Sequence, residues 1–120
     1  TAREGYYDAR AMGSDILLVR QGRKLGIDAV LEHIPAGERY YVTIDIDGFD
    51  PSIAPGTGTP SHGGFLYYEG LELLDGLAKR GTIVVVDLVE VAPDYDPSDL
   101  TAILSAQLLM NLIGRMMHHR

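Results

Sequence analysis

Two acidic residues near the middle of the chain have the types and spacing of a metal site. Asp45 and Asp47 end an apolar, β-branched stretch that begins at Tyr40. Residues two apart in a strand point to the same side of a sheet, so we expect the two carboxylates to project together. Close carboxylates in an apolar frame repel each other unless one is protonated or a cation bridges them. Oxygen ligands of this kind suit hard divalent ions such as manganese or magnesium.

Other interpretations of this segment have to be weighed. Asp-Gly and Asp-Pro pairs are common in solvated turns, and an isolated Asp-x-Asp fits a turn about as well as a metal site. An EF-hand calcium loop is excluded, because it would need an oxygen ligand at Phe49 and a glutamate at Gly56. The Asp-x-Asp-Gly-Thr motif of haloacid dehalogenase phosphatases is a better rival. It matches the segment up to Gly48, but Phe49 replaces its threonine.

The elements that position these residues follow from an alternation of apolar and amphipathic stretches. This alternation is typical of α/β units around a parallel sheet. We expect strands over residues 16–19, 40–46 and 82–88, and helices over residues 4–12, 23–33, 67–79 and 97–114. The last strand is apolar enough to be covered on both faces. Asp45 and Asp47 then lie at the carboxyl end of a strand, where open parallel sheets bind their ligands.

Composition narrows the classes of function. The chain has 120 residues, no cysteine, 10 Lys and Arg and a formal net charge of -7. The acidic balance argues against nucleic acid and anionic membranes as partners. The absence of cysteine excludes disulfide and thiolate chemistry and fits a reducing compartment. No apolar run reaches the roughly 18 residues that a membrane span needs, and no signal peptide opens the chain, so we expect a cytoplasmic protein.

Two longer motifs decide between the metal site and the turn. The first runs over residues 45–64 and contains Asp45-Ile-Asp-Gly-Phe-Asp-Pro51, then Ala54-Pro-Gly-Thr-Gly-Thr-Pro60, then Gly63-Gly64. The second contains Val86-Asp-Leu-Val-Glu-Val-Ala-Pro93, then Tyr95-Asp96. Together they resemble the C-terminal signature of the arginase and agmatinase family of ureohydrolases. The resemblance covers nearly the whole chain.

This resemblance implies a fold and a reaction. The fold is α/β, with three α/β/α layers around a mainly parallel sheet, and residues 1–120 are expected to be the C-terminal portion of a single such domain. In the family, a dinuclear manganese site holds a bridging hydroxide that attacks the guanidinium carbon and releases urea. By the match, Asp45 bridges the two manganese ions and Asp47 binds one of them. Glu90 pairs with the guanidinium group of the substrate.

Four further residues near these motifs have supporting roles in the resemblance. Asp50 and Asp87 match groups behind the metal ligands, although Asp50 fits a turn before a proline equally well. Asp87 lies within an apolar strand, where an unpaired charge is costly, so we expect it to have a partner. Thr57 and Thr59 are expected to brace the loop, and hydrogen bonding near the site is the alternative role.

The ligand set is incomplete in this sequence. The family takes further ligands from a Gly-Gly-Asp-His and an Asp-Ala-His segment, and neither occurs in these 120 residues. The histidines have no ligand spacing with the two aspartates: they are His33, His62, His118 and His119. We therefore predict that the isolated chain does not hydrolyse guanidino compounds. The opening Thr1-Ala-Arg-Glu4 does not resemble a natural start, and we expect a fragment of a longer protein.

The second motif looks more like agmatinase-type members than like arginases. An agmatine-like guanidino compound is therefore the expected substrate, with guanidinobutyrate and related acids still open. The family commonly forms homo-oligomers, and the resemblance implies one for the intact enzyme. Two alternatives stay open at this point: a non-catalytic α/β remnant or interaction module that has lost half of its site, and the phosphatase-like hydrolase.

Overall fold

A strand–helix–strand unit forms the centre of the computed structural model, which describes residues 3–119. Two parallel strands, β1 (Arg39–Asp45) and β2 (Thr82–Val89), are connected through helix α4 (Tyr67–Arg80). The other helices are α1 (Arg3–Ala11), α2 (Val19–Leu25), α3 (Ile27–Leu31) and α5 (Leu100–His118). A 3-10 turn follows each strand: η1 (Ile46–Gly48) and η2 (Pro93–Tyr95). The α/β class with a parallel sheet, predicted from the sequence, is confirmed.

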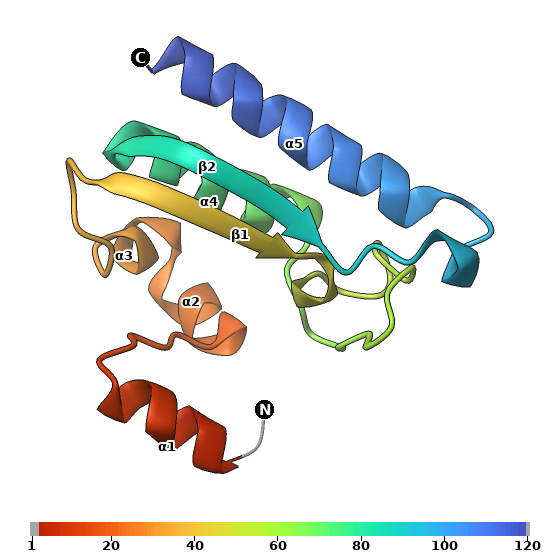
Figure 1. The fold of residues 1–120 in the computed structure, drawn as a ribbon, viewed down its shortest axis with the longest axis horizontal. Helices are drawn as coiled ribbons and strands as arrows, with labels where there is room; N and C mark the ends of the chain where they lie inside the picture. The colour runs from red at the N-terminus through yellow and green to blue at the C-terminus, as the bar shows by residue number, and fades with distance from the viewer. Residues whose placement is uncertain (1–2, 120) are drawn as a thin grey trace.

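The hydrophobic core lies between one face of this sheet and helices α4 and α5. Ile44 of β1, Leu74 and Ala78 of α4 and Leu108 of α5 belong to one buried cluster. The buried stripe of α5 recurs at three- and four-residue spacing, which is the period of one helix face: its members are Thr101, Leu104, Ser105, Leu108 and Leu112. Figure 1 shows α4 behind the sheet and α5 beside β2. This packing determines which side of each strand faces the core.

The opposite side of the sheet, called here the open face, consists of outward residues from both strands. These residues are Tyr41, Thr43, Asp45, Val85, Asp87 and Val89. Within residues 3–119 no helix covers this side, as Figure 1 shows. The described part of the chain therefore forms two of the three expected layers, and it carries Asp45 and Asp87 on the uncovered side.

Contrary to the prediction, β2 is packed on one face only within residues 3–119, and its register against β1 also contains an irregularity. Tyr40 pairs with Ile83, but Tyr41 pairs with Val85, so Val84 has no register partner. The extra residue reverses the alternation of β2. Ile83 faces the core, Val84 and Val85 are 44% and 53% exposed, and alternation then resumes in the other phase. Val89 is exposed on the same side as Val85, so only one side of the strand is packed within residues 3–119.

Sequence patterns were least informative before residue 39. The strand expected over residues 16–19 is absent, and Leu18 is instead the extended residue before α2. The single helix expected over residues 23–33 is two helices, because Gly26 has a φ of 86° and interrupts the helical backbone. The other predicted elements are confirmed with small changes in their ends, and α5 extends four residues further than expected, to His118.

Helix α5 corrects one further expectation. Its 19 residues have a mean hydropathy of 1.3 and are long and apolar enough to cross a membrane, contrary to the sequence prediction. Only 28% of this stretch is buried. Its buried stripe packs on α4 and β2, so part of the apolar composition serves the protein core.

Candidate functional site

Asp45 and Asp47 lie together at the carboxyl end of β1, but not for the reason expected. The strand ends at Asp45, and Asp47 lies in the 3-10 turn η1 rather than in the strand. A carboxylate oxygen of Asp45 accepts the backbone N–H of Asp47 at 3.2 Å, as in an Asx turn. The Thr59 hydroxyl donates to the other acid, with 2.8 Å between Oγ1 and Asp47 Oδ2. A turn therefore brings the two side chains together.

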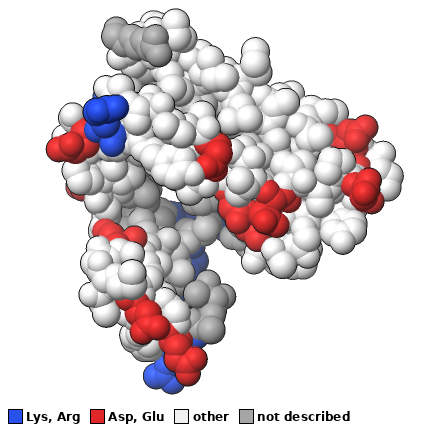
Figure 2. Space-filling view, in the orientation of Figure 1, with Lys and Arg blue, Asp and Glu red and all other residues white. Residues whose placement is uncertain are grey.

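The electrostatics of the β1 end favour a cation. Partial burial of the Asp45 carboxyl group, followed by the like charge of Asp47, raises the pKa of Asp45. In the view of Figure 1, acidic side chains gather where the two strands end (Figure 2). A bound cation would relieve this repulsion, whereas a solvated turn has no need of two adjacent carboxylates.

Glu90 lies at the same edge of the sheet, directly after β2. Asp45 is the register partner of Val89, so Glu90 follows the residue that pairs with Asp45. Glu90 has a φ of 66°, in the left-handed region that side chains other than Gly, Asn and Asp rarely adopt. Such strain at the end of a strand is concentrated in functional sites. The fold thus brings the three main residues of the predicted site to one edge.

Asp50 has the contacts of a loop brace. Its two carboxylate oxygens accept the N–H groups of Ser52 at 3.0 Å and Gly63 at 2.8 Å. Hydrogen bonds from Ser52 and then Gly63 lower its pKa from 3.8 to about 2. Both oxygens are therefore occupied within the loop that follows β1, and the contact to Gly63 closes that loop.

Asp87 has hydrogen-bond partners, as we expected for a charged residue within an apolar strand. It accepts hydrogen bonds from the hydroxyl of Thr43, at 2.6 Å, and from the hydroxyl of Tyr41, both on the open face. These bonds, that of Thr43 first, lower the pKa of Asp87. Thr57, in contrast, is only 3% exposed, and its hydroxyl oxygen has no hydrogen-bond partner among residues 3–119.

A buried junction joins the loop after β1 to the segment after β2. Asp96 is 4% exposed and accepts from the hydroxyls of Ser98, at 2.5 Å, and Thr101, at 2.7 Å. The Thr101 oxygen accepts the N–H of Gly56 at 2.7 Å, and the carbonyl of Gly56 accepts the N–H of Ala92 at 2.8 Å. Asp96 belongs to the second sequence motif, but nothing in the sequence indicated Thr101 or this link.

The comparisons with known proteins agree with this geometry. A family model described as the arginase family matches residues 1–114. The chain belongs to the arginase family. It is 39% identical over 117 residues to putative agmatinase 3 of Schizosaccharomyces pombe, and 40% identical over 105 residues to agmatinase of Chromobacterium violaceum. These matches cover 95% and 85% of this chain but 28% and 32% of the two relatives.

A solved structure gives the same result for the fold. Proclavaminate amidino hydrolase from Streptomyces clavuligerus superimposes with a TM-score of 0.86 at 33% identity, over 93% of this chain and 38% of that protein. The chain thus spans about a third of the length of the arginase-family members that it matches. The resemblance inferred from the two motifs is confirmed, as is the expectation that the chain corresponds to part of the family fold.

The arginase-family metal site is only partly represented here. In residues 3–119 no group of three or more histidine, aspartate or glutamate side chains is arranged to hold a metal ion. His62 is exposed in the loop, His33 pairs with Asp15, and His119 lies 3.7 Å from a carboxylate oxygen of Asp75. Asp45 and Asp47 fit two oxygen ligands of a hard cation, and the remaining ligands would have to come from elsewhere.

A second link, which was also not predicted from the sequence, holds the end of the loop that follows β1. Arg23 of α2 forms two hydrogen bonds with Glu69, of 2.8 and 2.9 Å, and donates to the carbonyls of Gly63 and Gly64. Arg23 and then the N–H of Leu66 lower the pKa of Glu69 to about 2. A planar guanidinium facing a carboxylate is a geometrically specific pair. The residues around Arg23 in the sequence do not indicate that its partner is Glu69, 46 positions away.

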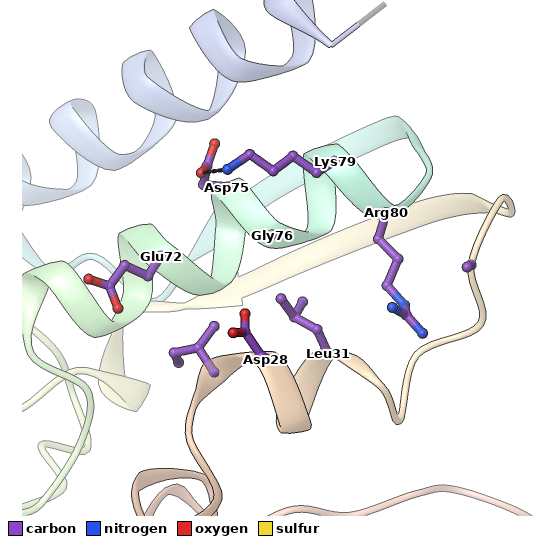
Figure 3. A pocket seen from close by; sticks show the side chains of 9 residues that line it. Asp28, Leu31, Glu72, Asp75, Gly76, Lys79 and Arg80 are labelled. Atoms are coloured by element: carbon purple, nitrogen blue, oxygen red, sulfur yellow. Dashed lines mark ion pairs between the residues drawn. The ribbon is translucent and has the colours of Figure 1, made fainter.

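A cavity of about 730 Å³ lies between α3 and α4 (Figure 3). Asp28, Leu31, Glu72 and Gly76 are among the residues that line it, and Lys79 and Asp75 of α4 form an ion pair. None of the candidate site residues lines this cavity. It is an open groove between two helices, so its size carries no argument about the reaction. The chemistry of this chain is concentrated at the carboxyl ends of the strands.

Proposed function

We propose that the protein containing this chain hydrolyses a guanidino compound to an amine and urea with the help of manganese. The chain would supply one side of a dinuclear manganese site, with Asp45 and Asp47 as ligands. The observation that carries the proposal is the meeting of Asp45, Asp47 and Glu90 at the carboxyl ends of two paired parallel strands. Membership of the arginase family supports the same reaction class.

Each residue has a distinct task in this proposal. Manganese, when bound, supplies the positive charge that makes hydroxide available near neutral pH. Asp45 and Asp47 provide anionic oxygen donors, and Thr59 holds Asp47 in a fixed orientation through its hydroxyl. Glu90 presents a carboxylate that can accept two parallel hydrogen bonds from a planar guanidinium group.

An agmatine-like compound is the proposed substrate class. The two relatives described above, both named as agmatinases, share 39% and 40% identity with this chain, and the second motif has the agmatinase-type form. A cytoplasmic homo-oligomer is the corresponding proposal for the intact enzyme. Fractionation of cells and light scattering of the purified full-length gene product would test these two points.

The experiment that tests the function uses the full-length gene product that contains these residues. The protein is stripped of metal, reloaded with manganese, and assayed for urea with agmatine, guanidinobutyrate and arginine. We expect urea release with at least one of them, lost on chelation and restored by manganese. Hydrolysis of p-nitrophenyl phosphate without urea release would favour the phosphatase-like alternative and contradict the proposal.

The isolated chain favours a second candidate, the non-catalytic remnant, because its described residues contain only part of a ligand set. We expect the 120-residue chain to bind manganese weakly and to release no urea. Isothermal titration with manganese and a urea assay on the same preparation test this directly. Appreciable urea release from the chain alone would show that two carboxylates and Glu90 suffice.

A further inference from the structure

We infer that Asp96 is a positioning residue for Glu90: through Thr101 and Gly56 it fixes the segment after β2 against the loop after β1. The inference rests on the proposed function, because Glu90 is the group that would hold the guanidinium. Asp96 itself lies six residues beyond Glu90 and is directed at the start of α5.

Both oxygens of the Asp96 carboxylate accept hydrogen bonds from residues at or just before the start of α5. One oxygen accepts the hydroxyl and the N–H of Ser98, at 2.5 and 3.3 Å. The other accepts the hydroxyl and the N–H of Thr101, both at 2.7 Å. A carboxylate that receives this many bonds is strongly held in its charged form, and an acidic proton would break the arrangement.

The charge of Asp96 sets the direction of the next hydrogen bond. An ionised carboxylate can only accept, so the Thr101 hydroxyl must donate its single proton to Asp96. Its lone pairs are then available to the Gly56 N–H, which lies at 2.7 Å. The contact is close: a Cβ on Gly56 would stand 2.7 Å from the Asp96 Cβ and 2.9 Å from the Thr101 oxygen. Only glycine fits between them.

The Gly56 peptide connects this junction to the segment of Glu90 and to the loop that holds Asp47. Its carbonyl accepts the N–H of Ala92, two residues after Glu90, at 2.8 Å. Thr59, three residues after Gly56 in the same loop, donates to Asp47. The left-handed backbone of Glu90 costs free energy and persists only where the surroundings over-determine it. The bond from Ala92 to Gly56 is one such restraint, and Asp96 stabilises it through Thr101.

The test uses substitutions of Thr101 and Asp96 in the full-length gene product. Thr101→Val keeps the shape but removes the hydroxyl, whereas Thr101→Ser keeps the hydroxyl. Asp96→Asn replaces two of the acceptor sites by donors, and Asp94→Asn makes the same change in charge at an exposed acid in η2 as the matched control. Each variant is assayed for KM and kcat, and the segment 89–93 is followed by hydrogen–deuterium exchange.

A positioning role predicts a specific pattern. Thr101→Val and Asp96→Asn are expected to raise KM for the guanidino substrate about tenfold, which corresponds to about 1.4 kcal/mol. The Ala92 amide is expected to exchange about tenfold faster in both. Thr101→Ser and Asp94→Asn are expected to match the wild type. A role in stability alone would lower the active fraction and leave KM unchanged.

Each other outcome counts against one claim. An unchanged KM together with unchanged Ala92 exchange in Thr101→Val overturns the inference, even if Asp96→Asn fails to fold. Faster exchange with an unchanged KM shows that the link exists but does not place Glu90, and it overturns the inference as well. If the wild type releases no urea, the proposed function fails, while the exchange of Ala92 still decides whether the link holds this segment.

Discussion

Two acidic regions of this molecule have opposite surroundings. At the end of β1, Asp45 accepts one backbone N–H and faces the charge of Asp47, and its pKa is raised. At the junction with α5, Asp96 accepts four hydrogen bonds, and its pKa falls to about 2. The residue type is the same in both regions. The number of donors that the fold provides is different.

This difference separates carboxylates that can bind a cation from carboxylates that stabilise loops through hydrogen bonds. A carboxylate whose oxygens are filled by protein donors has none left for a ligand, as at Asp96 and Asp50. A carboxylate that keeps free oxygens beside a like charge is destabilised until a cation arrives. Counting donors therefore distinguishes the two uses of aspartate in this chain, which residue identity and spacing alone did not.

The largest expected effect comes from removing either acid at the β1 end. In the full-length gene product, Asp45→Asn or Asp47→Asn is expected to lower manganese-dependent urea release by roughly 100-fold or more, because a charged ligand is lost. Without metal, the same variants are expected to be as stable as the wild type or more so, since repulsion is relieved. Urea assays with manganese and thermal unfolding with chelator measure the two effects.

The Asp50→Asn variant is the control for this prediction. It alters an acid in the same loop that braces rather than binds, so it is expected to lower stability without changing the affinity for manganese. A metal-free Asp45→Asn protein that unfolds well below the wild-type temperature would break the distinction between the two regions.

The next effect concerns the close packing at the junction. Gly56→Ala would place a Cβ 2.7 Å from the Asp96 Cβ, and overpacking of this kind costs about 2 kcal/mol. Gly58→Ala in the same loop meets nothing within 4 Å, and we expect a change of less than about 0.5 kcal/mol. Chemical denaturation of the two variants gives the comparison. Equal stability of the two would mean that the junction can relax.

The smallest expected effect is the dependence of stability on pH. Folding lowers the pKa of Asp50 and of Asp96 from 3.8 to about 2, so their stabilisation is complete above about pH 4 and is lost as the pH falls towards 2. Asp45 has the opposite sign, because its pKa is raised and ionisation opposes folding as the pH rises. Unfolding curves between pH 2 and 6 test this.

In those curves, Asp96→Asn is expected to flatten the acid limb in the metal-free protein, and Asp94→Asn to leave it unchanged. A wild-type protein whose stability did not fall between pH 4 and pH 2 would contradict the role assigned to the bracing acids.

Local patterns predicted the parts of this fold that depend on neighbouring residues. The strands near residues 40–46 and 82–88 and the helix at 67–79 were predicted because apolar period and strand-forming residues coincide there. The strand at 16–19 was wrong because a strand needs a hydrogen-bonding partner, and apolar composition does not say whether one exists. Gly26 was the visible sign that the helix of residues 23–33 would break.

The candidate site divides in the same way. Asp45, Asp47 and Glu90 were predicted, since their motifs are contiguous in the sequence. The links from Thr101 to Gly56 and from Arg23 to Glu69 join residues 45 and 46 positions apart. The residues next to each partner in the sequence do not indicate the identity of the other partner. Such distant bonds arise from the packing of α5 and α2, which only the folded chain reveals.

The unpaired Val84 has a consequence for how this segment can change over generations. Ile83 faces the core while Val84 and Val85 are both exposed, so Val84 is one additional residue in β2 relative to β1. Exchanging Val84 for another β-branched residue leaves that count intact. Deleting it would place Val85 directly after Ile83 and restore strict alternation, so Asp87 would stay on the open face and Val86 and Leu88 would stay towards the core. The orientation of Asp87 therefore does not depend on the extra residue at Val84.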